Sequence, residues 1–238
     1  MSFIADGRAV APGRGWAWIA EGWELFRRAP GPWIALIVVA ALVFIGLALV
    51  PFLGSLAAMV LAPVFAAGFV IACRDEEEGR GVQVAHLFAG FRTHFGTLAA
   101  IGLIYLGITV AVALVVGLAT GAGMWTLLGS GDADPASVAG AGLTLLLAFL
   151  VMLALLLPVF MALWFAPALV VFHERSAAAA MKSSFIACLK NFVPFLLYGV
   201  IGFVLAMLAS IPFGLGWLVL GPVLAASLYT GYRDLFFD

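Results

Sequence analysis

The chain has 238 residues, of which 66% are hydrophobic and only 10% are charged. Soluble domains carry roughly 45–50% apolar and 25% charged residues, so this composition argues against a water-soluble protein. The net charge is −1, and the absence of a basic stripe argues against nucleic acid as a partner. The composition predicts a polytopic membrane protein.

The chain begins with a polar segment, residues 1–14, followed by an amphipathic helix over 16–28. At 100° per residue, four apolar side chains of this helix share one face: Trp16, Ile19, Trp23 and Phe26. Tryptophans beside charged residues suit the headgroup layer of a membrane, so we expect Trp16, Trp18 and Trp23 there. We expect no cleavable signal, because the first apolar run is about 20 residues long and leads straight into a second span.

Apolar stretches long enough to cross a membrane follow one another to the end of the chain. We predict six spans at roughly 33–50, 53–73, 96–120, 141–166, 193–211 and 214–232. Short uncharged turns at Pro51 and Pro212 join two of the pairs, whereas the loop at 129–140 carries two acids. Two further amphipathic segments, 82–95 and 176–191, precede the second and third pairs.

A proline-containing unit recurs near the end of each pair of spans. Pro63 precedes Arg74-Asp75 by eleven residues, and Pro222 precedes Arg233-Asp234 by the same number. Pro158 marks a partial copy that lacks the charged end. We therefore predict an all-α helical bundle in one integral membrane domain, 1–238. Its three parallel hairpin repeats cover about 16–75, 82–170 and 176–235, each beginning with an interfacial amphipathic helix.

The positions of the charges predict the topology. In the six-span scheme all eleven basic residues lie on one face, which the positive-inside rule assigns to the cytoplasm together with both termini. The amphipathic segments contribute the interfacial basic residues Arg27, Arg28, Arg92 and Lys190.

No group of residues predicts catalysis. The chain has no phosphate-binding Gly-Lys loop and no His-Glu-x-x-His, and the central turns of the predicted spans carry no ionisable group. His86, His94, Cys73 and Cys188 lack the spacing of metal ligands. We predict a protein that is not an enzyme and that has neither cofactor nor metal.

The charged ends of the repeats are the candidate sites. An arginine at the end of a span can bind lipid phosphates, and it can also pair with an acid of a neighbouring repeat. Arg74, Asp75, Arg233 and Asp234 are therefore predicted to anchor the bundle, either to lipid phosphate or to itself. Pro63, Pro158 and Pro222 are predicted to kink their helices, because each removes a backbone donor.

Several segments carry a resemblance: 15–33, 167–170, 184–195 and the closing Tyr229-Thr230-Gly231-Tyr232-Arg233-Asp234 run. Together they resemble an uncharacterised family of six-span proteobacterial inner-membrane proteins, distantly similar to the membrane domain of some glycerophosphodiester phosphodiesterases. The resemblance implies a bacterial inner membrane location and no reaction.

The leading hypothesis is a non-enzymatic inner-membrane protein that acts as a binding or accessory subunit for a lipid or another apolar ligand. One alternative is a small transporter, or the substrate-binding membrane component of one. Another is a scaffold subunit of a larger membrane complex. The expected partners are membrane lipids and either a membrane protein or a second copy of the chain.

Overall fold

The computed structural model describes residues 2–129 and 135–238, and the side chains within them except those of 122–137. Most of the described chain is helical, and an isolated antiparallel bridge joins Phe3 to Phe237. Its elements are α1 (Arg14–Arg28), α2 (Pro30–Ala48), α3 (Leu53–Glu77), the 3₁₀ helix η1 (Val84–Phe88), α4 (Ala89–Thr93), α5 (Phe95–Gly129), α6 (Pro135–Trp164), α7 (Ala166–His173), α8 (Ala177–Lys190), α9 (Phe192–Ser210) and α10 (Trp217–Phe236).

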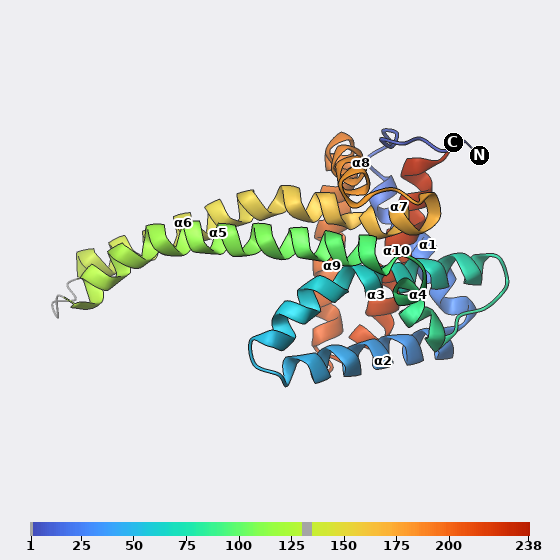
Figure 1. Ribbon diagram of the computed structural model, residues 1–238, viewed down its shortest axis with the longest axis horizontal. Helices are drawn as coiled ribbons and strands as arrows, with labels where there is room; N and C mark the ends of the chain where they lie inside the picture. Colours follow the sequence, from blue (N-terminus) through green and yellow to red (C-terminus); the bar gives the residue numbers. More distant parts are fainter. Residues whose placement is uncertain (1, 130–134) are drawn as a thin grey trace.

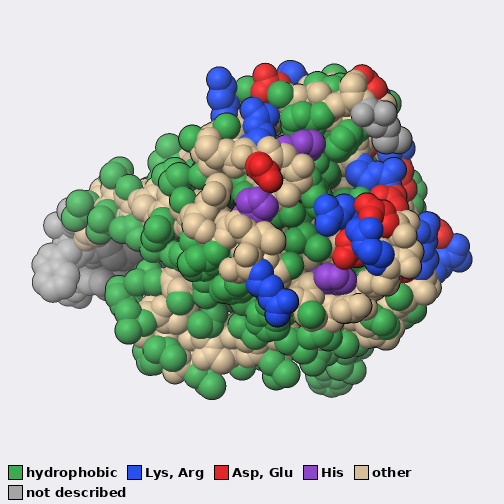
Figure 2. Space-filling model, turned by 45° about the vertical axis from the view of Figure 1, so that its right-hand side comes forward, with side chains coloured by type: hydrophobic (Ala, Val, Ile, Leu, Met, Phe, Trp, Pro, Cys, Tyr) green, Lys and Arg blue, Asp and Glu red, His purple; other side chains and the backbone are tan. Residues whose placement is uncertain are grey.

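Three helical hairpins diverge from the part of the molecule where α1, α7 and both termini lie, which is called the base below (Figure 1). The α5–α6 hairpin projects far beyond the rest of the molecule, α2 and α3 form a second hairpin, and α9 and α10 form a third (Figure 1). The two termini lie side by side, and the Ile4 N–H donates to the Phe236 carbonyl at 2.9 Å. Charged side chains gather on the side formed by this base, while much of the remaining visible surface is hydrophobic (Figure 2).

Five helices are long and apolar enough to cross a membrane: Pro30–Ala48, Leu53–Glu77, Phe95–Gly121, Val138–His173 and Phe192–Ser210. The sixth predicted span, 214–232, is not among them, so six spans and their repeat relationship stay predictions. Span 214–232 is missing from this group because of the surroundings of α10, which packs against α1, α2, α3 and α9. Because these helices shield α10, it carries polar residues such as Ser227, Thr230 and Asp234 in its second half.

The first and third hairpins turn in the same way. Each turn has a proline followed by an exposed phenylalanine with positive φ, +64° at Phe52 and +51° at Phe213. A glycine then brings the second helix against the first: a Cβ on Gly54 would lie 1.7 Å from the Leu47 carbonyl, and one on Gly216 would lie 2.5 Å from Ala209 Cα. These glycines permit the tight antiparallel packing that the short turns predicted.

Helix α1 contradicts the predicted environment of one tryptophan. Ile19 and Phe26 of the predicted face are buried, but so is Trp18, with 1% of its surface exposed, whereas Trp16 and Trp23 are exposed. The difference arises because α1 is a packing element of the base, where its glycines allow close approach to two other helices. A Cβ on Gly15 would meet the Pro194 carbonyl of α9, and one on Gly22 would meet the Val223 carbonyl of α10. Trp18 lies between these contacts and is therefore not in a headgroup layer.

The second amphipathic segment is likewise not one α-helix. Residues 82–95 form the 3₁₀ helix η1 and the short α4, and only Leu87 and Gly90 of these two elements are buried. A capping box begins η1, with Gln83 and His86 bonding each other's backbone N–H groups. Gly68 of α3 approaches the His86 and Leu87 carbonyls. This close backbone contact with α3 favours the tighter 3₁₀ helix. The hydrophobic periodicity of the sequence does not reveal such a contact.

The hairpin contact at Gly54 is testable. Gly54→Ala should lower the melting temperature of the detergent-purified protein by several degrees, because its Cβ overlaps the Leu47 carbonyl and overpacking costs about 1–3 kcal/mol. Gly46→Ala in the same hairpin is the matched control, since nothing lies within 4 Å of its Cβ position. Equal melting temperatures for both variants would contradict this account of the turn.

Candidate functional site

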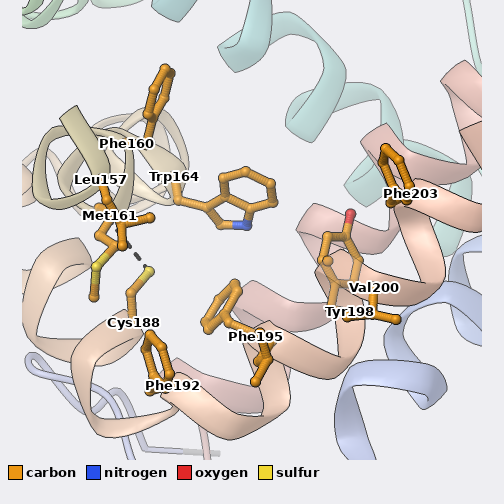
Figure 3. A pocket seen from close by; sticks show the side chains of 12 residues that line it. Leu157, Phe160, Met161, Trp164, Cys188, Phe192, Phe195, Tyr198, Val200 and Phe203 are labelled. Atoms are coloured by element: carbon orange, nitrogen blue, oxygen red, sulfur yellow. Dashed lines mark hydrogen bonds between the residues drawn. The ribbon is translucent and has the colours of Figure 1, made fainter. Parts of the chain in front are cut away.

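A cavity of about 520 Å³ opens between α6, α8 and α9 (Figure 3); it is called the α6–α9 cavity below. Its lining is aliphatic and aromatic, with the tyrosine hydroxyl, the indole N–H and one thiol as its polar side-chain atoms. The residues that line it are Leu157, Phe160, Met161 and Trp164 of α6, Cys188 of α8, and Phe192, Phe195, Leu196, Tyr198, Gly199, Val200 and Phe203 of α9.

The base of the cavity is fixed by contacts between α6 and α8. The Ser184 hydroxyl donates to the Met161 carbonyl at 2.6 Å and accepts the Phe165 N–H at 2.9 Å. The Cys188 thiol donates to the same Met161 carbonyl at 3.5 Å. Beyond this point α6 continues into the projecting hairpin while α9 runs in another direction (Figure 1). The wedge between the two diverging helices is the cavity.

Aromatic rings form the wall on the α9 side. Phe195 lies between two tryptophans, with ring centroids 5.2 Å from Trp18 and 6.1 Å from Trp164. The Tyr198 hydroxyl bonds the Ser227 hydroxyl of α10 at 2.8 Å, which satisfies the polar end of that ring. An apolar cleft with so few polar groups is suited to a hydrocarbon chain and has nothing that would pair with a buried charge.

Cys188 is a protonated thiol. Burial raises its pKa to about 12, a shift that the nearby Ser184 hydroxyl opposes. The thiolate is the nucleophilic form of cysteine, so this side chain is inert at neutral pH. Cys73 is also buried and, like Cys188, has a free thiol.

The structure places each predicted acid at the centre of a hydrogen-bonded group. Asp234, with 9% of its side chain exposed, accepts from Arg14 Nε at 2.6 Å, Trp18 Nε1 at 2.8 Å and Arg8 Nη2 at 3.0 Å. Burial lowers the pKa of Arg14, but the hydrogen bonds and charges of Asp234 and Glu21 together outweigh burial, so the net pKa is raised. Asp234 therefore ties α10 to the N-terminal segment and to α1.

Asp75 makes a corresponding group at the end of α3. Its carboxylate accepts from Arg80 Nη2 at 2.6 Å and lies 3.1 Å from His86 Nε2 of η1. Arg80 also pairs with Glu78. Each acid thus connects the end of a hairpin to another amphipathic segment, η1 for Asp75 and α1 for Asp234.

The two predicted arginines, Arg74 and Arg233, line one polar cavity of about 450 Å³ at the ends of α3, α7 and α10. The interfacial basic residues are more dispersed. Arg27 pairs with Glu24 in α1, Arg28 and Arg92 are exposed, and Lys190 donates to the Asp6 and Gly7 carbonyls. A role of these basic residues in binding lipid phosphate stays a prediction.

The three prolines lie inside helices: Pro63 in α3, Pro158 in α6 and Pro222 in α10. Pro63 and Pro222 are buried in the base, whereas Pro158 is exposed next to the α6–α9 cavity. The kinks themselves stay a prediction.

Sequence reasoning missed the α6–α9 cavity. Its walls come from residues 157–164 and 188–203, and each stretch by itself is only an apolar helix with aromatic residues. The one available signal was the density of aromatic residues at 160–165 and 192–203, which a lipid-facing helix also shows.

The chain was compared with known proteins. A family model described as a domain of unknown function (DUF7847) matches residues 21–231. A protein of Burkholderia thailandensis named as a probable inner membrane protein is 32% identical over 227 residues, which cover 92% of this chain and 82% of the relative. No solved structure shows significant similarity. Neither match is to a glycerophosphodiester phosphodiesterase, so nothing in them supports that part of the resemblance.

The state of Cys188 gives a prediction. The folded protein in detergent should react with a maleimide far more slowly than the denatured protein, because both cysteines are buried and the Cys188 thiol stays protonated. Leu189→Cys is the positive control, because Leu189, the residue next to Cys188, is exposed. Rapid stoichiometric labelling of the native chain, measured by intact-protein mass spectrometry, would contradict the buried placement.

Proposed function

The chain belongs to the family described as a domain of unknown function (DUF7847), and on that premise we propose that it is a non-enzymatic inner-membrane protein that binds a lipid through the α6–α9 cavity. The name of the Burkholderia relative supports the inner membrane as its location. The five apolar helices support integration into the bilayer.

The α6–α9 cavity is the observation that carries the proposal. It is open, it lies between two helices that are apolar enough to cross a membrane, and its wall is aromatic and aliphatic. A protein core is normally packed without voids of this size, so such a cleft in a bilayer fills with hydrocarbon. One or two acyl chains of a membrane lipid are the occupants that this chemistry favours, and the protein then acts as a lipid-binding or accessory subunit.

We also propose that both termini are cytoplasmic. The termini lie side by side, so they must be on the same face of the membrane, which requires an even number of crossings. Five apolar helices are an odd number, and α10, which returns antiparallel from α9, supplies the sixth. Its polar groups face α1, α3 and α9 rather than lipid, as in other membrane proteins where polar residues point into the bundle.

The lipid cavity can be tested with two glycines of α9. Nothing lies within 4 Å of a Cβ built on Gly199 or on Gly202, but only Gly199 lines the cavity. Gly199→Phe should fill the cleft and reduce the lipid retained after detergent washing on the order of tenfold, equivalent to about 1.4 kcal/mol. Gly202→Phe should leave it unchanged. Native mass spectrometry measures both.

The result that would contradict the proposal is equal lipid retention by the native chain and the Gly199→Phe variant, provided that both are monodisperse. Loss of lipid from Gly202→Phe alone would place the lipid on another face of α9.

The topology can be tested by reporter fusions. A fusion at Asp238 should give a cytoplasmic signal, because every Lys and Arg belongs to that face in the six-span scheme. A fusion at Asp132, which lies outside the described residues, should give a periplasmic signal. Periplasmic signals at both sites would mean that α10 does not cross, and the even-crossing argument would be wrong. A cytoplasmic signal at Asp132 with a periplasmic signal at Asp238 would reverse the proposed orientation.

A further inference from the structure

The polar cavity at the ends of α3, α7 and α10 is here called the end pocket. It brings together Arg74 and Glu77 of α3, Phe172 and His173 of α7, and Tyr232 and Arg233 of α10. Its position is independent of the α6–α9 cavity, and the lining residues of the two cavities do not overlap.

Arg74 has one long ion pair and one aromatic contact. Its guanidinium carbon lies 4.9 Å from the centroid of the Phe172 ring, which is a cation–π contact. Its buried Nε has no hydrogen-bond partner among the described residues, and the nearest carboxylate oxygen, Asp75 Oδ1, is 3.6 Å away. Asp75 is already engaged by Arg80 and His86. The buried Nε does not reach the pocket, but 40% of the Arg74 side chain is exposed, so its terminal amino groups can bind a phosphate.

Negative charge also lines the pocket, beside Arg74 at the end of α3. Glu77 pairs with Arg233 and accepts the Tyr229 hydroxyl at 2.8 Å, so each of its oxygens keeps a free lone pair. Glu78 lines the pocket as well and pairs with the exposed Arg80. In addition α3, α7 and α10 all end here, at Glu77, His173 and Phe236, and the carboxyl end of a helix carries a partial negative charge. A simple anion would be repelled from this part of the pocket, whereas an ammonium group would be attracted to it.

We propose that the end pocket binds a zwitterionic group that combines a phosphate with an ammonium, as a phosphoethanolamine headgroup does. Arg74 binds the phosphate, and the carboxylates of Glu77 and Glu78 receive the ammonium. The pair between His173 Nε2 and the Tyr232 hydroxyl, 2.7 Å apart, adds polar contacts. The ligand is either a membrane lipid, whose chains lie outside the pocket, or a soluble phosphate ester of the same chemistry.

The test uses the full-length protein in detergent and three probes: dihexanoyl phosphatidylethanolamine, dihexanoyl phosphatidylglycerol and glycerophosphoethanolamine, with dissociation constants from calorimetry. The ethanolamine lipid should bind more tightly than the glycerol lipid. Arg74→Gln should weaken both lipids about tenfold, the size of one charged hydrogen bond. Glu78→Gln should weaken only the ethanolamine lipid, by about threefold. Lys182→Gln, which changes an exposed lysine outside the pocket, should change neither.

Equal affinity of the native chain for the two lipids would overturn the proposal, and so would an Arg74→Gln variant that binds as the native chain does. If Arg74→Gln does not fold, Arg74→Lys replaces it, because it keeps the charge, and it should lose part of the affinity for both lipids together with the planar fork. Binding of glycerophosphoethanolamine as tight as that of the lipid would identify a soluble ligand. Much weaker binding of glycerophosphoethanolamine than of the ethanolamine lipid would identify a membrane lipid as the ligand.

Discussion

The structure depends on the carboxylate of Asp234 more than on any other polar group. It is nearly buried, and it accepts hydrogen bonds from Arg8, Arg14 and Trp18. A buried carboxylate is stable only when it is paired. Since its partners come from the other end of the chain, satisfying this one charge joins the first and last segments and places α1 across α9 and α10. The termini then lie together on one side of the molecule.

Trp18 connects Asp234 to the wall of the α6–α9 cavity. The indole N–H is held by Asp234, and the ring packs against Phe195 and Tyr198, which line the cavity. One wall of the cleft is therefore supported from behind by α1. The other wall, α6, is joined to α8 at the base of the cavity through Ser184 and Met161, and it packs against α5 along the projecting hairpin. A wall backed by α1 that faces a helix of the projecting hairpin suits a site for a flexible hydrocarbon chain.

Local signals predicted the hairpins and little of what connects them. Apolar length and the turns at Pro51 and Pro212 placed the helices of the first and third hairpins within about four residues, because a span must satisfy its own backbone within the bilayer, whereas α5 and α6 extend further toward their loop than predicted. Trp18 was assigned to the wrong environment, because the preference of tryptophan for the headgroup layer does not reveal an indole that packs inside the protein. The grouping of Arg8 and Arg14 around Asp234 joins residues at opposite ends of the chain, and only the fold brings them together. Arg74 and Arg233 were recognised from equal spacing, but not their shared pocket.

The central claim is that a lipid chain occupies the cleft between α6 and α9. The most direct measurement is a cryo-electron microscopy map of the protein in nanodiscs of native membrane lipid, with an antibody fragment as a marker. The account predicts elongated density in the cleft between α6 and α9, running along α9 past Gly199. A map in which α6 closes onto α9, so that their side chains fill the cleft, would contradict it.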